Sequence, residues 1–217
     1  MLHGRKLTAR GDCTMISTNG DTNNVTGALT RWAGVCGLAG GPALAAAYLA
    51  HPSSATPEIV ASPFWIWVHV GFMASLLGGV FLLIGLLGRY FNSGGGYSGF
   101  VGFVFAIVSL IFVFGLDYAE VFIFPTLAVS HPDVVIQYGD GTSMPSVAFA
   151  FPAAGVMFLI GFLLFSWALL KSAVIGRGAA TLTMLGAVVF TLGLSGVFPM
   201  YVVKTGATVF GGGLVWL

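Results

Sequence analysis

The chain has 217 residues, of which 57% are hydrophobic and only 7% are charged, and its formal net charge is +1. Soluble domains carry about 25% charged residues, so this composition excludes an ordinary water-exposed surface and indicates a membrane protein. The near-neutral charge excludes the basic field that nucleic-acid binding requires. The two cysteines, Cys13 and Cys36, form no CxxC pair, which excludes a disulfide framework and a zinc knuckle.

The first thirty residues differ from the rest because they are polar and contain several charges. They have no apolar core, so they are not a secretory signal. We expect residues 1–30 to form a flexible cytoplasmic N-terminal tail. Met15 is an alternative start, because residues 1–14 differ in character from the remainder of the chain.

Five apolar segments come after this tail, and each is long enough to cross a bilayer as a helix, which takes roughly 20 residues. They are too long and too uniformly apolar for barrel strands, which alternate over about 10 residues. Because the backbone must satisfy its own hydrogen bonds in hydrocarbon, the sequence predicts helices. The prediction is an all-α transmembrane helical bundle, a single domain over residues 31–217, with spanning helices at residues 32–50, 63–88, 100–129, 145–170 and 179–203.

The last segment, residues 205–217, is apolar but has only thirteen residues. At about 1.5 Å per residue it reaches roughly 20 Å, less than the thickness of the hydrocarbon core. Three interpretations stay open: a C-terminal half-span, a re-entrant piece, or a truncated sixth helix.

The basic residues predict the orientation, because they accumulate on the cytoplasmic side. With the N-terminus inside, only Lys204 falls on the outer side. The inner side then holds Arg5, Lys6, Arg10, Arg31, Arg89, Lys171 and Arg177. We therefore expect a multi-pass protein of the bacterial cytoplasmic membrane with a cytoplasmic N-terminus.

Three ionisable residues lie inside the apolar segments, namely His69, Asp117 and Glu120. The i, i+3 spacing of the two acids puts them on one helix face, and all three residues fall in one layer of the outer leaflet. An ionisable group inside a membrane is costly and usually faces a partner in the bundle. Imidazole with carboxylate suits Zn²⁺ or another first-row divalent ion, so one interpretation is a metal or proton site, to which His51 and His131 could contribute.

Two plainer interpretations compete with this site. In the first, His69 hydrogen-bonds a carboxylate or a carbonyl and only locks two helices together. In the second, the third helix ends near Leu116 and leaves both acids in the outer interface. A haem on His69 would need a second histidine at matching depth, and by residue count His51 and His131 are too shallow.

Enzyme motifs are missing: the sequence has no GxSxG, no HExxH, no P-loop and no dinucleotide fingerprint. The sequence names no cofactor either. We therefore expect a non-enzymatic integral membrane protein. Its partners are the lipid bilayer and, by hypothesis, other membrane subunits or copies of itself, but no nucleic acid.

The order of features resembles a group of uncharacterised bacterial multi-spanning membrane proteins. The segments that carry the resemblance are residues 29–32, 48–52, 61–65 with His69, Asp117 with Pro125, and 211–217. The resemblance covers about residues 29–217 and implies a helical membrane fold that completes a sixth helix beyond the last segment. It implies no activity.

Three functions remain as hypotheses. The first is an accessory or structural subunit of a larger membrane complex, because the chain has small loops and no soluble domain. The second is a small transporter or ion-binding protein that uses the His69, Asp117 and Glu120 layer. The third is a redox subunit associated with haem or quinone.

Overall fold

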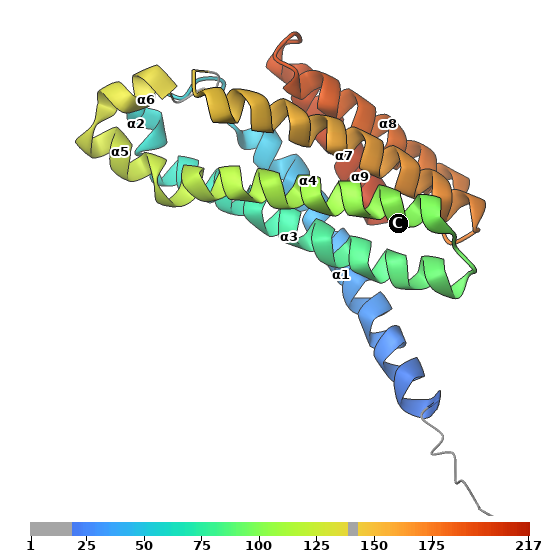
Figure 1. The fold of residues 1–217 in the computed structure, drawn as a ribbon. Helices are drawn as coiled ribbons and strands as arrows, with labels where there is room; N and C mark the ends of the chain where they lie inside the picture. The colour runs from blue at the N-terminus through green and yellow to red at the C-terminus, as the bar shows by residue number, and fades with distance from the viewer. Residues whose placement is uncertain (1–18, 139–142) are drawn as a thin grey trace, which may run out of the picture.

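The computed structural model describes residues 19–138 and 143–217, and within them all regular secondary structure is helical (Figure 1). Three short helices lie together at one end of the molecule: α2 (Pro57–Val60), α5 (Phe124–Ser130) and α6 (Pro132–Tyr138). The long helices are α1 (Asn19–Ala50), α3 (Pro63–Asn92), α4 (Tyr97–Phe122), α7 (Pro145–Lys171), α8 (Arg177–Leu194) and α9 (Met200–Trp216).

Five spans in the described part of the chain are long and apolar enough to cross a membrane, with α4 and α5 counting as one continuous span. This confirms the predicted all-α bundle and a multi-pass membrane protein. The second and fourth spans begin at the predicted residues. Each begins with a proline at its first turn, and Ser62 accepts a hydrogen bond from the Trp65 backbone N–H at 3.3 Å, capping α3.

The six long helices form a closed ring, because each packs against the next in the order α1, α3, α4, α7, α8, α9, and α9 packs against α1. Close backbone approach closes the ring. A Cβ atom on Gly41 would overlap the carbonyl oxygen of Gly211, and a Cβ on Gly211 would overlap that of Gly41. Small residues allow such approach where lipid provides no hydrophobic drive for association.

Aromatic side chains fill the middle of the ring. Phe158 lies with its ring centroid 5.0 Å from that of Phe210 and 5.6 Å from that of Phe190, and Phe162 lies 4.8 Å from Phe210. These rings come from α7, α8 and α9, and all four are buried. Edge-to-face contacts of this kind stabilise a packed centre.

The structure corrects the predicted start of the first helix. Residues 1–18, including the alternative start Met15, lie outside the described residues. From Asn19 onward the chain is helical, so α1 begins well before the expected residue 32 and includes part of the expected tail. Polar residues can extend a helix past the membrane surface, which a search for apolar runs does not detect.

The predicted fifth helix, 179–203, is also wrong at its end. Helix α8 stops at Leu194, where Gly196 adopts a positive φ of 74° and Pro199 ends the turn. The expected partial segment 205–217 is the larger part of α9, a continuous helix of 17 residues that packs along α8 and α1.

The third predicted helix, 100–129, is interrupted near its C-terminal end. Helix α4 ends at Phe122 and α5 begins at Phe124. Pro125 explains the break, because a proline ring clashes with the carbonyl four residues earlier and has no N–H to donate.

Candidate functional site

The short helices lie at the N-terminal end of α3 and the C-terminal end of α4 and enclose Trp65. We call this end of the bundle the outer end, a label taken from the orientation that the sequence predicts. Trp65 is 3% exposed and packs in a small apolar cluster with Val60, Ala128 and Val135. These residues come from α2, α5, α6 and the first turn of α3. We call this group the outer cap, and it shields the candidate site from one side.

Two histidines meet beside Trp65. His69, on α3, is 4% exposed, and His51 is half-buried in the loop after α1. Their ring centroids lie 5.3 Å apart with planes at 69°. Trp65 contacts both rings, at 4.4 Å from His69 and 5.4 Å from His51. Sequence reasoning placed His51 at a shallow corner and named it as an additional ligand of the His69 site, but it did not predict this ring contact.

The hydrogen bonds of the two rings define which nitrogen carries a proton. The Nδ1 atom of His69 lies 3.0 Å from the carbonyl oxygen of Trp65, and that of His51 lies 2.7 Å from the carbonyl oxygen of Pro52. A carbonyl oxygen only accepts, so Nδ1 donates in both rings. In the neutral form of each ring the proton is on Nδ1, and Nε2 keeps its lone pair.

The charge state of His51 is biased by its surroundings. Burial lowers the pKa of His51 below the usual value, the hydrogen bond to Pro52 opposes this, and the positive charge of Lys204 lowers it further. Lys204 itself donates a hydrogen bond from Nζ to the Leu49 carbonyl oxygen at 3.0 Å. The cationic side chain is thereby held at the outer end of α1.

The two acids of α4 adjoin each other, and Glu120 also adjoins Trp65. Asp117 and Glu120 are half-buried, and each interacts electrostatically with a neighbour: Asp117 with Glu120 and with Tyr48, and Glu120 with the Trp65 side chain. The Trp65 Nε1–H is buried and does not complete a hydrogen bond. Since α4 continues to Phe122, both acids lie inside the helix, and the interpretation that ends this helix near Leu116 is wrong.

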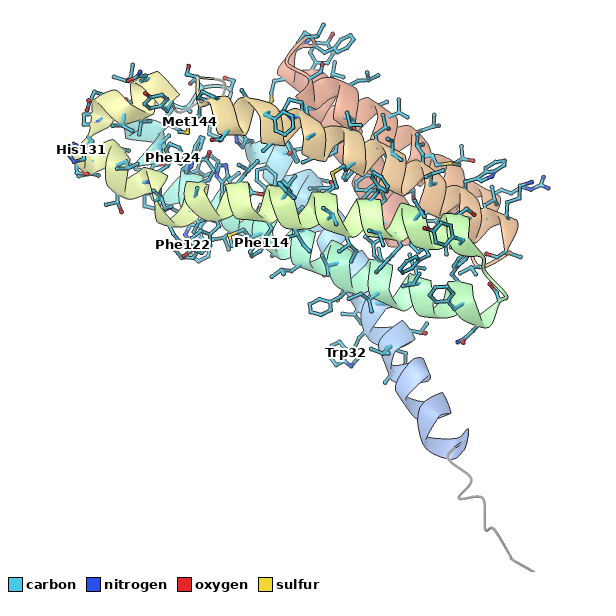
Figure 2. The ribbon with its side chains drawn as sticks, in the orientation of Figure 1. Trp32, Phe114, Phe122, Phe124, His131 and Met144 are labelled. Carbon is cyan, nitrogen blue, oxygen red and sulfur yellow. The ribbon has the colours of Figure 1, made fainter. Side chains whose placement is uncertain are left out.

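The structure brings some of the predicted site residues close together and leaves His131 apart from them. His69 and Glu120 both adjoin Trp65, and Asp117 adjoins Glu120. His131 is exposed at the corner between α5 and α6, at the far end of the molecule (Figure 2), and has no ring contact with His51 or His69. Among residues 19–138 and 143–217, no three His, Cys, Asp or Glu side chains are close enough to hold one metal ion. This geometry gives no support to a metal site made of His69, Asp117 and Glu120, which stays a prediction.

The competing interpretation of His69 as a helix lock has partial support. Its hydrogen bond goes to Trp65, one turn earlier on the same helix, and not to a carboxylate on another. The contact of His69 with His51 does join α3 to the loop after α1.

Comparisons with known proteins do not assign this chain to a family. No protein-family model matches the chain, and no curated protein and no solved structure matches it. The function must therefore be argued from the residues of the site.

Proposed function

We propose that this protein binds and releases a proton or another small cation in the outer half of a membrane, and that Asp117 and Glu120 carry out the binding. The observation that supports this is the placement of two carboxyl groups on one face of a spanning helix, half-buried and adjacent to each other. Carboxyl groups inside a membrane are expensive and commonly mark ion or proton pathways.

The neighbours of the carboxyl pair are suited to a cation site. Tyr48 offers a hydroxyl near Asp117, and Trp65 offers a buried N–H near Glu120. No ion pair holds either carboxyl group within the described part of the chain. A structural pair would be neutralised by Lys or Arg, whereas this pair can respond to a proton or to an added cation.

A flux assay on the full chain in lipid vesicles tests the proposal. We expect Asp117→Asn to reduce proton or Na⁺ flux by about tenfold or more, and Glu120→Gln to do the same, because each removes a carboxyl group with little change of shape. Glu58→Gln is the matched control, since Glu58 is exposed outside the spanning helices. The measurement is the response of a dye trapped in the vesicles.

Two results would contradict this function. The first is equal flux in the wild type and in both carboxyl variants. The second is the same loss of flux in Glu58→Gln. Difference infrared spectroscopy provides a second readout, because a proton-binding carboxyl group must change its C=O band on a pH jump and Asp117→Asn must remove that change.

An accessory-subunit role is the competing function, and one observation favours it. The N-terminal end of α1 extends beyond the bundle (Figure 1), and α1 carries large exposed apolar side chains, among them Trp32 at 69% and Leu38 at 60% exposed. Native mass spectrometry of the particle released gently from its own membranes separates the two. Further protein chains favour the subunit, and a lone chain favours the cation site.

We also propose that the chain lies in a bacterial cytoplasmic membrane with its N-terminus inside. The Arg89 side chain donates a hydrogen bond to the Val174 carbonyl oxygen at 3.4 Å, so the loops that carry Arg89, Lys171 and Arg177 meet at one end. Lys204 lies at the other end, near Leu49. Basic residues gathered at one end support that end being cytoplasmic. Reporter fusions in the loops near residues 54 and 94 test this, with outside activity expected only for the first.

A further inference from the structure

We propose that His51 and His69 form a two-histidine site for a first-row transition-metal ion such as Zn²⁺, at the outer end of the bundle and beside the Trp65 ring. The site uses neither Asp117 nor Glu120. It therefore goes beyond the proposed function and does not rest on it.

The spacing of the two rings fits a shared ion. The ion lies about 2.1 Å from Nε2, and Nε2 lies about 1.1 Å from the centre of its ring, so each ring centroid is about 3.2 Å from the ion. When two such rings bind at a tetrahedral angle, their centroids are about 5.2 Å apart. The His51 and His69 centroids lie 5.3 Å apart. This separation matches the one expected when both rings bind one ion through Nε2.

The hydrogen bonds prepare both rings as ligands. Metal-binding histidines usually donate the other ring N–H to a carbonyl or carboxylate, which fixes the tautomer and the orientation of the ring. His51 donates Nδ1–H to Pro52, and His69 donates it to Trp65. No protein group in the described residues hydrogen-bonds to Nε2 of either ring. Both Nε2 lone pairs are therefore available to one ion.

The surroundings leave room for an open coordination shell. His69 is buried but His51 is half-buried, and Ser53 and Ser54 beside it are exposed, so water reaches the pair from the loop after α1. Because no third His, Cys, Asp or Glu of the described chain joins the pair, the remaining positions belong to water or an external ligand. Catalytic zinc sites likewise keep an open position beside their protein ligands, whereas structural sites are closed by four protein ligands.

The experiment uses the full chain in detergent or nanodiscs, prepared without a polyhistidine tag and in a His3→Ala background. Zn²⁺ binding is measured by equilibrium dialysis, and Co²⁺ provides a visible spectrum that reports coordination. We expect one ion per chain. We expect His51→Gln and His69→Gln each to weaken binding by at least about tenfold, since even outer-shell changes cost 10–100-fold.

His131→Gln is the matched control, because it removes an exposed outer histidine that touches neither ring. It should bind Zn²⁺ like the parent. The Trp65→Phe variant tests where the ion binds. Bound Co²⁺ should quench the tryptophan fluorescence of the parent but quench that of Trp65→Phe much less, because Trp65 adjoins both rings.

Three results would overturn the site: unchanged Zn²⁺ binding in His51→Gln, loss of binding in His131→Gln, or loss of binding only in Asp117→Asn or Glu120→Gln. The last result would move the ion to the carboxyl pair and would leave the proposed function standing. Conversely, normal Zn²⁺ binding in a chain without carboxyl-dependent flux would support the histidine site and contradict the proposed function.

Discussion

The outer end of the bundle and the rest of it, which we call the body, differ in the contacts that hold them together. The body is held by glycines that let helix backbones touch, as at Gly41 and Gly211, with phenylalanine rings between the helices. The outer end has short helices around Trp65, and it brings together two histidines and two acids. In the body, the glycine contacts leave no space for a side chain, whereas the ionisable groups lie beside the short helices. Close backbone packing and the ionisable side chains thus lie in two different regions of the chain.

The largest expected effect is in the body. Gly41→Leu should lower the free energy of unfolding by about 3 kcal/mol or more, because the new side chain must displace the Gly211 backbone and not a flexible side chain. Thermal unfolding in detergent is the measurement. Gly34→Leu, on the same helix but with open space around it, is the control. Equal losses in the two variants would contradict the closed ring.

A smaller effect is expected in the outer cap. Val135→Ala should cost about 1.5 kcal/mol of local stability, because two buried carbon groups are lost from a side chain that is 1% exposed. Ile136→Ala is the control, since its side chain is 75% exposed. Hydrogen exchange should show faster opening of α5 and α6 in Val135→Ala alone, with the body unchanged. Uniform loosening of both regions would show that the cap and the body are not separate.

The smallest effect is expected where the two regions meet. Lys204→Met removes the hydrogen bond from Nζ to the Leu49 carbonyl oxygen and should cost about 1 kcal/mol or less. The loop after α1, including His51, should exchange its amide hydrogens faster, while α3 keeps its protection. If exchange in this loop stays the same, Lys204 does not hold it.

Sequence reasoning found some helix ends and missed others, and particular residues show why. Pro63 and Pro145 begin their helices as expected, because proline at a first turn leaves little alternative. The break at Gly196 and Pro199 was missed because the residues between them are apolar and continue the hydrophobic run. Apolar runs report lipid contact, not the exact end of a helix.

The site was predicted in part, and again the reason is physical. Spacing along one helix places Asp117 and Glu120 on one face, so their adjacency could be foreseen. The approach of His51 to His69 depends on how the loop after α1 folds back over α3, a long-range feature that spacing does not contain. A His-Pro corner next to a helix with an inward histidine is the signal that could have suggested it.

The contact between Gly41 and Gly211 has a consequence for how the chain is made. It joins α1 to α9, so the ring stays open until α9 has left the ribosome. During synthesis α1 enters the bilayer before α9 is available, and until then its small-residue face contacts lipid or an insertion factor. A substitution that slows the arrival of α9 should therefore reduce the yield of assembled protein more than its effect on the finished fold implies, and proteolysis during a timed pulse of synthesis would reveal the waiting state.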